Sequence, residues 1–187
     1  SAQRLSGRNR HADHAAHAGM SVAGATVTVR IAGPGFAQWH GLLALIQSSF
    51  AYMQGRINPP SSALGLSADG LAERAKTETL IVALGENGAV LGCAFCADQG
   101  DAVYIGKLAV SPDHQGQGLG RRLLEAAADL ARQQGCHKLR LQTRVELVEN
   151  HHAFAAMGFE ETGRSAHAGF AQPTSITMEK HLLPAAP

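Results

Sequence analysis

Residues 103–124 read VYIGKLAVSPDHQGQGLGRRLL, and this stretch decides the fold. It begins with an alternating, largely apolar run that is typical of a β-strand, and a helix-like pattern follows from residue 118. Gly116, Gly118 and Gly120 stand where the strand leads into the helix. Glycine adopts positive φ readily and lets a ligand approach the main chain closely. The stretch therefore predicts a strand, a glycine-rich turn and a helix in direct succession.

The glycine-rich turn indicates a phosphate ligand, because its N–H groups converge on a concavity at the positive end of a helix dipole. A tight turn without a ligand would need one glycine, whereas three occur here. A nucleotide-hydrolysing P-loop requires Lys and then Ser or Thr after its last glycine, but Arg121 and Arg122 follow Gly120. A dinucleotide site places its glycines directly after the strand, but residues 111–114 intervene. A nucleotide-phosphate binder is therefore kept only as a third hypothesis.

The composition favours an ordinary globular protein. The 187 residues are 45% hydrophobic and 17% charged, with a formal net charge of +1. This balance gives no reason to expect a nucleic acid partner, and no apolar run approaches the ~20 residues that span a membrane. Three cysteines are an odd number and do not resemble a disulfide framework. We therefore expect a cytoplasmic protein with neither a nucleic acid nor a membrane partner.

Residues 1–25 differ from the rest, because they are polar and rich in small residues without an apolar face. We predict a disordered tail at 1–25 and a single domain over 26–183. His11, His14 and His17 are evenly spaced, but no Cys or carboxylate cluster completes a site. We therefore expect no metal.

Hydrophobic periodicity predicts an α/β fold with a mixed, mostly antiparallel central sheet flanked by helices. The expected strands are 26–31, 79–84, 89–97, 103–110, 138–143, 159–164 and 174–180. The expected helices are 36–50, 71–76, 118–134 and 149–157. The strands at 103–110 and 138–143 should be parallel neighbours, because a single crossover helix connects them.

Residues 108–124 resemble the acyl-CoA-binding signature of the GCN5-related N-acetyltransferase (GNAT) superfamily. In that signature an apolar-Ala-Val triplet ends a strand, and Gln/Arg-x-x-Gly-x-Gly/Ala opens a helix. Gln115, Gly118 and Gly120 fill this pattern. Residues 149–163, ENHHAFAAMGFEETG, resemble a second hallmark of the family, an Asn-led helix followed by Gly-Phe and a strand.

The resemblance implies the acyl-CoA N-acyltransferase fold, with a splayed parallel strand pair, and acetyl-CoA as co-substrate. It implies that Leu108, Ala109 and Val110 bind the pantetheine arm through their backbone, and that the turn and Asn150 hold the rest. The cofactor-binding residues so implied are Leu108, Ala109, Val110, Gln115, Gly116, Gln117, Gly118, Leu119, Gly120, Arg121 and Asn150. The backbone N–H of Leu108 resembles the family's oxyanion donor.

Two positions depart from the common family pattern. Many relatives carry a Glu on the fourth strand as the base, and this chain has Tyr104 there. Many relatives also carry a Tyr four residues before Gly-Phe as the acid, and this chain has Phe154 there. Tyr is a poor base at neutral pH and Phe has no proton to give. Asp101, Glu146 and His152 are substitute candidates for the base.

Other noticeable residues favour structural roles. Cys93 and Cys96 form a C-x-x-C, but an odd step along a strand points them to opposite faces, which indicates buried structural cysteines. We expect Trp39 to pack the first helix, and His114 to face solvent from its loop.

The resemblance predicts an N-acetyltransferase that moves an acetyl group from acetyl-CoA to a primary amine of a small molecule, peptide or protein. The alternative is an acyl-CoA-binding sensor or regulatory domain with weak catalysis, which Tyr104 and Phe154 would explain. A homodimer is left open.

Overall fold

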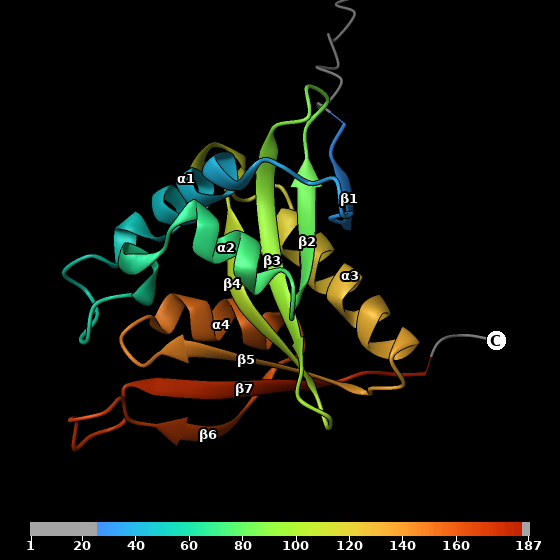
Figure 1. The fold of residues 1–187 in the computed structure, drawn as a ribbon. Helices are drawn as coiled ribbons and strands as arrows, with labels where there is room; N and C mark the ends of the chain where they lie inside the picture. Colours follow the sequence, from blue (N-terminus) through green and yellow to red (C-terminus); the bar gives the residue numbers. More distant parts are fainter. Residues whose placement is uncertain (1–25, 185–187) are drawn as a thin grey trace, which may run out of the picture.

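The computed structural model describes residues 26–184, so the predicted tail and its three histidines lie outside the described residues. Seven strands form one sheet in the order β1-β2-β3-β4-β5-β7-β6 (Figure 1). The strands are β1 (Thr28–Ile31), β2 (Thr79–Leu84), β3 (Val90–Asp98), β4 (Val103–Val110), β5 (Lys138–Arg144), β6 (Glu160–Ser165) and β7 (Ser175–His181). The helices are α1 (Trp39–Phe50), α2 (Ala68–Arg74), α3 (Leu119–Gln133) and α4 (Val148–Ala156), with short 3-10 helices η1 (Ala51–Met53), η2 (Ser62–Gly65) and η3 (Pro112–His114).

The pairing confirms the predicted fold class. All neighbouring strands in the sheet are antiparallel except β4 and β5, which are parallel, as the crossover through α3 requires. Helices α1 and α2 cover one face of the sheet, and α3 covers the other (Figure 1). In the part of the chain that the structure describes, no helix is both long and apolar enough to cross a membrane.

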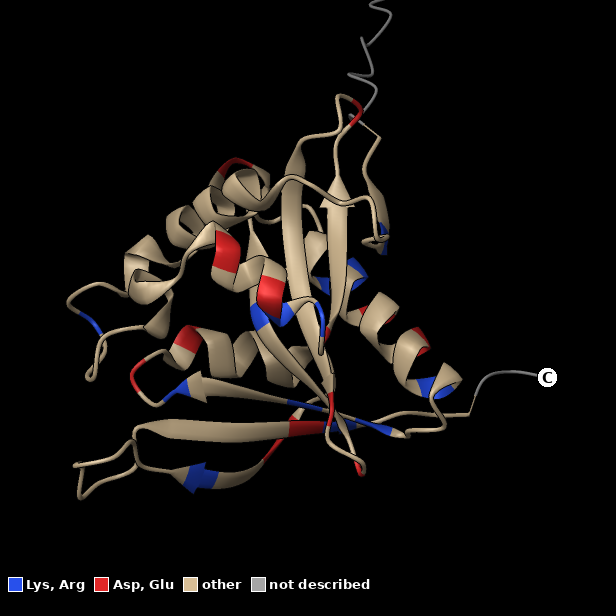
Figure 2. Cartoon of the chain, in the orientation of Figure 1, with Lys and Arg blue, Asp and Glu red and all other residues tan. Residues whose placement is uncertain are grey.

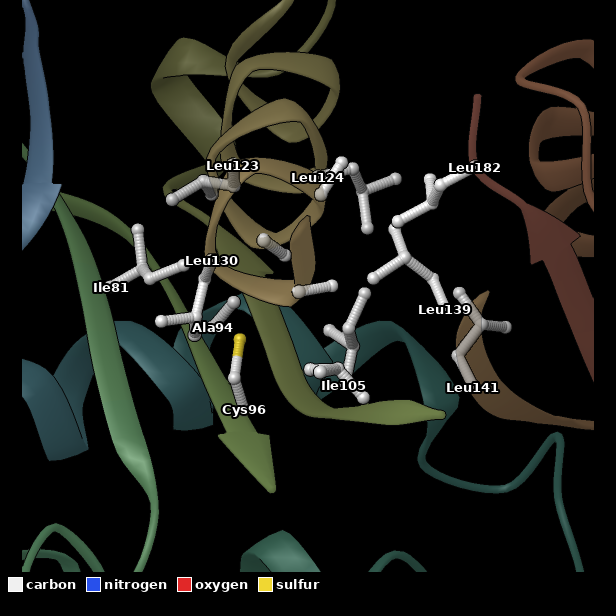
Figure 3. Close-up of a cluster of buried hydrophobic side chains, with 14 of the residues drawn as sticks. Ile81, Ala94, Cys96, Ile105, Leu123, Leu124, Leu130, Leu139, Leu141 and Leu182 are labelled. Atoms are coloured by element: carbon white, nitrogen blue, oxygen red, sulfur yellow. The ribbon is translucent and has the colours of Figure 1, made fainter. Parts of the chain in front are cut away.

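Each face of the sheet has its own hydrophobic core. On the α3 face, Leu123 and Leu130 pack with residues of the strands such as Ile105 and Leu139 (Figure 3). On the α1 face, the sheet residue Phe95 packs with Leu42, Ile46 and Leu71 of α1 and α2. The two cores lie back to back across the sheet, so the sheet is held rigid over β2, β3 and the first half of β4.

Helix α3 forms because its apolar residues recur on one side. The predicted stripe, Leu119, Leu123, Ala127 and Leu130, is buried, whereas the charged residues between them face solvent. The left-handed Gly118 (φ 79°) precedes the helix, and Gly135 (φ 73°) follows it. Leu123 is fully buried, so truncation to Ala should cost about 2–5 kcal/mol.

The first helix begins three residues later than the sequence pattern predicted. Phe36 donates its backbone N–H to the carbonyl oxygen of Gly33 (3.0 Å), so residues 33–36 close a turn instead of entering the helix. The Phe36 ring then packs edge-on against Trp39 with 4.8 Å between ring centroids. Trp39 packs against the α1-face core, as expected.

Cys93 and Cys96 lie on opposite faces of β3, as the odd spacing predicted. Cys93 belongs to the α1-face core and Cys96 to the α3-face core. Burial raises the pKa of both thiols to about 12, which makes them unreactive at neutral pH. Among residues 26–184, no group of three or more His, Cys, Asp or Glu residues is placed to hold a metal ion.

Strands β4 and β5 separate along their length and leave a wedge between them. They pair only from Val103–Leu139 to Ile105–Leu141, although β4 continues to Val110 and β5 to Arg144. An ion cluster holds the paired end, where Arg140 of β5 binds both Asp101 (2.6 Å) and Glu179 of β7 (2.7 Å). Both signs of charge meet at this end of β5 and β7 (Figure 2). The sheet is therefore fixed at one end of the wedge and open at the other.

Candidate active site

A cavity of about 940 Å³ occupies the open wedge. Its walls come from β4, β5, the turn before α3, the start of α4, and the connection between α1 and α2. Segments that are far apart in the sequence therefore meet where β4 and β5 separate. A wedge of this kind offers free backbone groups as well as side chains to a ligand.

The glycine-rich turn closes one end of the cavity. Gly116 (φ 75°) and Gly118 (φ 79°) have positive φ, which other residues rarely adopt. Gly120 has an ordinary backbone, and a Cβ atom placed there would meet nothing within 4 Å. No side chain caps the N-terminus of α3, so its first N–H groups are free for an anion. Phosphate oxygens fit this cradle.

The exposed edge of β4 forms the wall next to that cradle. Pairing of β3 with β4 shifts between Cys93 and Phe95, where Lys107 and Leu108 together oppose the single residue Ala94. This β-bulge interrupts the hydrogen-bond ladder and turns the strand, and Lys107 takes a left-handed conformation (φ 50°). Backbone groups near Leu108 can thus point into the wedge instead of completing the sheet.

The structure places most of the residues implied for cofactor binding at this cavity. Its lining includes Leu108, Val110, Gln115, Gly116, Gly118, Leu119, Gly120 and Asn150. The Ala109 side chain instead packs in the α1-face core, which leaves only its backbone for a ligand. Gln117 is exposed, and Arg121 lines a smaller hollow of about 330 Å³ beside α3.

Several buried polar atoms at the cavity have no hydrogen-bond partner in the described structure. His114 Nδ1, Thr143 Oγ1 and Arg144 Nη1 are three such atoms, and all three residues line the cavity. Buried polar atoms are normally paired, since an unmade hydrogen bond costs about 1–3 kcal/mol. A fourth such atom, Glu146 Oε2, belongs to a residue outside the cavity lining, so three of the four are placed where a bound ligand or water can complete them. The expectation that His114 faces solvent was wrong, because its ring is partly buried against the cavity.

The other end of the cavity is lined by side chains, three of them cationic. Arg74 of α2, Lys107 of β4 and Arg144 of β5 contribute the positive charges. Arg74 lies over Gly106, where a Cβ atom would approach its Nη2 to 2.8 Å. Tyr104 also lines this end, and burial raises its pKa, so the phenol is neutral and a poor base.

The positions where relatives carry the acid and the base, Phe154 and Tyr104, both line the cavity. The structure supplies neither position with a group that could exchange a proton at neutral pH. Phe154 packs its ring against Phe159, with 5.8 Å between centroids. Asp101, Glu146 and His152 are not among the residues that line the cavity, so its geometry gives no support to a role as substitute base. The Asp101 carboxylate is bound by Arg140 and Lys138, which hold its pKa at about 2.

Sequence reasoning missed His167, which lines the cavity from the connection between β6 and β7. Its Nδ1 contacts the Thr174 hydroxyl, and that hydroxyl donates to the carbonyl oxygen of Ser165 (3.4 Å). The Thr174 hydroxyl also accepts the backbone N–H of His167 (2.9 Å), so this network holds the ring in place at the cavity. No local motif marks His167, since it reaches the site only through the pairing of β6 with β7.

Two contacts join the α1–α2 connection to α4 across the cavity. Asn150 donates its side-chain amide to the Tyr52 hydroxyl (3.1 Å), and Arg56 forms an ion pair with Glu149 (2.6 Å). Tyr52, Glu149 and Asn150 line the cavity. Asn150 is thus at the site, and in this structure its amide is engaged by a protein hydroxyl.

Comparison with known proteins gives a consistent result. Residues 40–159 match the sequence profile of the Acetyltransferase (GNAT) family. An IAA acetyltransferase from Azospirillum brasilense is 32% identical over 110 residues, which cover 58% of this chain and 71% of that protein. An aminoglycoside N(6')-acetyltransferase type 1 from Stenotrophomonas maltophilia is 49% identical over 55 residues. Those 55 residues cover 29% of this chain and 36% of that protein, so the chain spans about a third of that relative's length.

The fold is shared with solved structures at low sequence identity. The crystal structure of an N-acetyltransferase from Thermoplasma acidophilum in complex with coenzyme A superposes with a TM-score of 0.70. The two chains are 13% identical, and the superposition covers 83% of this chain and 99% of the other. At this identity the likeness concerns the fold alone.

Proposed function

The chain belongs to the Acetyltransferase (GNAT) family, and we propose that it transfers the acetyl group of acetyl-CoA to a primary amine bound at the cationic end of its cavity. The observation that carries this proposal is the open wedge between β4 and β5, with a glycine cradle at one end. The acceptor amine would enter between β4, β5 and the α1–α2 connection.

The residues implied by the family resemblance would hold acetyl-CoA as follows. The N–H groups of the turn and of the first turn of α3 would bind the pyrophosphate, with no glycine side chain in the way. The backbone of residues 108–110 would bind the pantetheine arm as an added strand, since β5 leaves this edge of β4 unpaired. When bound, the co-substrate would supply a thioester: the amine attacks its carbonyl carbon, the C–S bond breaks, and CoA leaves as a thiolate that takes up a proton.

Three tasks then fall to this chain. It must orient the amine, stabilise the oxyanion that forms on the carbonyl oxygen, and accept the proton that the amine loses. The bulge at Lys107 supports the N–H of Leu108 as the oxyanion donor, because the sheet ladder is interrupted there. For the proton we propose His167 Nε2, directly or through a water molecule, because its hydrogen bond to Thr174 orients the ring.

A thermal-shift and turnover experiment tests this function. Acetyl-CoA should raise the melting temperature, because a ligand that binds only the native state stabilises it. NAD and ATP at equal concentration should raise it far less. CoA release in the presence of a broad amine panel should follow. A larger shift with ATP or NAD would contradict the cofactor assignment.

An acyl-CoA-binding sensor with weak catalysis is the second candidate function. Phe154 favours it, because this residue has no ionisable group. Tyr104 favours it too, because burial raises the pKa of its phenol and keeps the phenol neutral. Acetyl-CoA binding without CoA release from any amine in the panel would support this candidate.

We also propose that residues 26–183 form a single domain and that the protein works in a reducing compartment such as the cytoplasm. The three cysteines are all unpaired and buried, which supports the compartment. A homodimer stays a prediction, to be checked by the mass of the protein in solution.

A further inference from the structure

The three cations of the cavity share one side of the sheet. Tyr104 and Gly106 of β4 point toward the face that α1 and α2 cover, since Val103 and Ile105 belong to the α3-face core. Arg74 lies on that same side, over Gly106. Lys107 and Arg144 bind the α1–α2 connection, Lys107 through the hydroxyl of Ser62 (2.7 Å) and Arg144 through the carbonyl of Pro60 (3.3 Å).

Lys107 and Arg144 lack an acidic partner within the described residues. Arg74 forms an ion pair with Glu78, but no carboxylate oxygen lies within 4.0 Å of a Lys107 or Arg144 nitrogen in residues 26–184. The Glu146 carboxylate raises the pKa of Arg144 through its charge, but it lies more than 4.0 Å from the Arg144 nitrogens. Arg144 Nη1 is buried without a hydrogen-bond partner, so one side of the guanidinium is unused.

The protein holds these charges together against their repulsion. Burial, and then the charges of Arg74 and Arg144, lower the pKa of Lys107. Glu149 is the acidic residue in the cavity lining, and Arg56 already neutralises it. Lys107 also takes a left-handed backbone conformation that costs free energy for a residue with a side chain. Like charges at a partly buried wall are stabilised when an anion binds between them.

The phosphates of acetyl-CoA would not occupy this place. Their cradle is the N-terminus of α3, which packs on the opposite face of the sheet. Lys107 and Arg144 instead contact Ser62 and Pro60, which belong to the α1–α2 connection that forms the acceptor side of the cavity. An anion between the two cations would therefore be part of the acceptor.

We propose that the acceptor is an amine that also carries a carboxylate, and that Lys107 and Arg144 bind this carboxylate while the amine faces the thioester. The proposal rests on the acetyl-transfer function above and deepens it. A planar carboxylate suits the free edge of a guanidinium and a neighbouring ammonium, which together form charge-assisted hydrogen bonds. A polycationic amine, such as an aminoglycoside, would meet repulsion from the same wall.

The test compares acceptors that differ only in charge. The panel contains α- and ω-amino acids, their methyl esters, aminophosphonates of matched length, and one aminoglycoside, each assayed for CoA release. For the best amino acid, kcat/KM should exceed that of its methyl ester by at least about tenfold, or about 1.4 kcal/mol, because the ester carries no charge for Lys107 and Arg144 to bind. The difference should lie mainly in KM, because the carboxylate is held equally in the ground and transition states.

Variants locate the effect. Lys107→Gln and Arg144→Gln should each reduce the ratio of acid to ester kcat/KM by at least about tenfold. Calorimetric binding of the amino acid to the CoA-loaded protein should weaken in parallel. Arg30→Gln is the matched control, because Arg30 is an exposed cation of β1 outside the cavity lining, and it should change neither value.

The outcomes separate the two levels of the proposal. Equal or higher kcat/KM for methyl esters or the aminoglycoside would overturn the carboxylate site and leave acetyl transfer standing. A preference for aminophosphonates over amino acids would overturn the assignment to a carboxylate. No CoA release with any acceptor, together with no stabilisation by acetyl-CoA, would overturn the proposed function and this inference with it.

Discussion

At the α3 end of the cavity, the groups that meet a ligand belong to the backbone, whereas at the α1–α2 end they belong to side chains. The first end is a turn with two left-handed glycines and an uncapped helix N-terminus. The second end is a wall of Arg74, Lys107 and Arg144, and His167 also lines the cavity. Backbone groups keep the same positions in any sequence that folds the same way. They therefore suit the binding of a co-substrate that a whole family shares. Side chains can change independently, so they suit an acceptor that differs from one relative to the next.

The largest expected effect concerns the side-chain end. His167→Gln removes the proposed base, so kcat/KM should fall by roughly 10²-fold, at the lower end of what loss of a general base costs. The measurement is kcat/KM against pH for the best acceptor. The affinity for acetyl-CoA should stay unchanged, because the backbone end of the cavity is not altered.

His152→Gln is the control for that substitution, because His152 is exposed on α4 and does not line the cavity. If both histidine variants keep full activity and the same pH profile, His167 is not the base. The side-chain end would then serve binding alone.

The next effect concerns the backbone end. Gly120→Val places a branched side chain where the pyrophosphate would lie, without straining the backbone, so acetyl-CoA affinity should fall at least tenfold, or about 1.4 kcal/mol. Titration calorimetry measures this. Gly163→Val is matched, because that glycine also has open space around its Cβ position, but it lies on β6 outside the cavity lining.

Unchanged acetyl-CoA affinity in a folded Gly120→Val protein would contradict the assignment of the backbone end to the co-substrate. It would mean that the glycines serve the turn and that acetyl-CoA is held by other groups.

A smaller effect is expected at the two positions that depart from the family pattern. Tyr104→Phe should reduce kcat/KM by less than about tenfold, because burial raises the phenol pKa and keeps it from acting as a base. Phe154→Tyr should preserve or raise activity, since it supplies the acid that relatives carry. Loss of a basic limb of the pH–rate profile in Tyr104→Phe would show that the phenol takes part in proton transfer.

The smallest effect is expected at the closed end of the wedge. Arg140 and Lys138 lower the pKa of Asp101 to about 2, so its ion pairs stabilise the fold above the unfolded pKa of ~3.9 and are lost as the pH falls through about 2. Asp101→Asn should therefore lower the melting temperature slightly at pH 7, and the difference should shrink as the pH falls toward 2 and vanish below it.

Glu125→Gln, an exposed position on α3, is the control for charge removal and should leave the melting temperature unchanged. A difference between Asp101→Asn and the parent protein that is as large at pH 2 as at pH 7 would mean that the ion pairs are not its source.

Local pattern determined the elements and one end of the site. The period of α3, the alternation in the strands and the hairpin chemistry at 85–88 each involve neighbours in the sequence, so the fold class and the parallel β4–β5 pair could be predicted. The start of α1 could not, because a turn from Gly33 to Phe36 competed with the helix, and the packing of Phe36 against Trp39 favoured the turn.

The sequence by itself determined the backbone end of the cavity, because one contiguous stretch, residues 108–120, carries the strand edge, the turn and the helix N-terminus. Only the tertiary structure decided the acceptor end. Arg74, Lys107, Arg144 and His167 are separated by more than twenty residues at each step and meet because α2 crosses β4, and because β5 pairs with β7. Their charges interact only after this packing brings them together, since Coulomb interactions in water fade within about 10 Å. The groups proposed to bind the acceptor therefore depend on the tertiary structure, whereas those proposed to bind the co-substrate lie in one stretch of sequence.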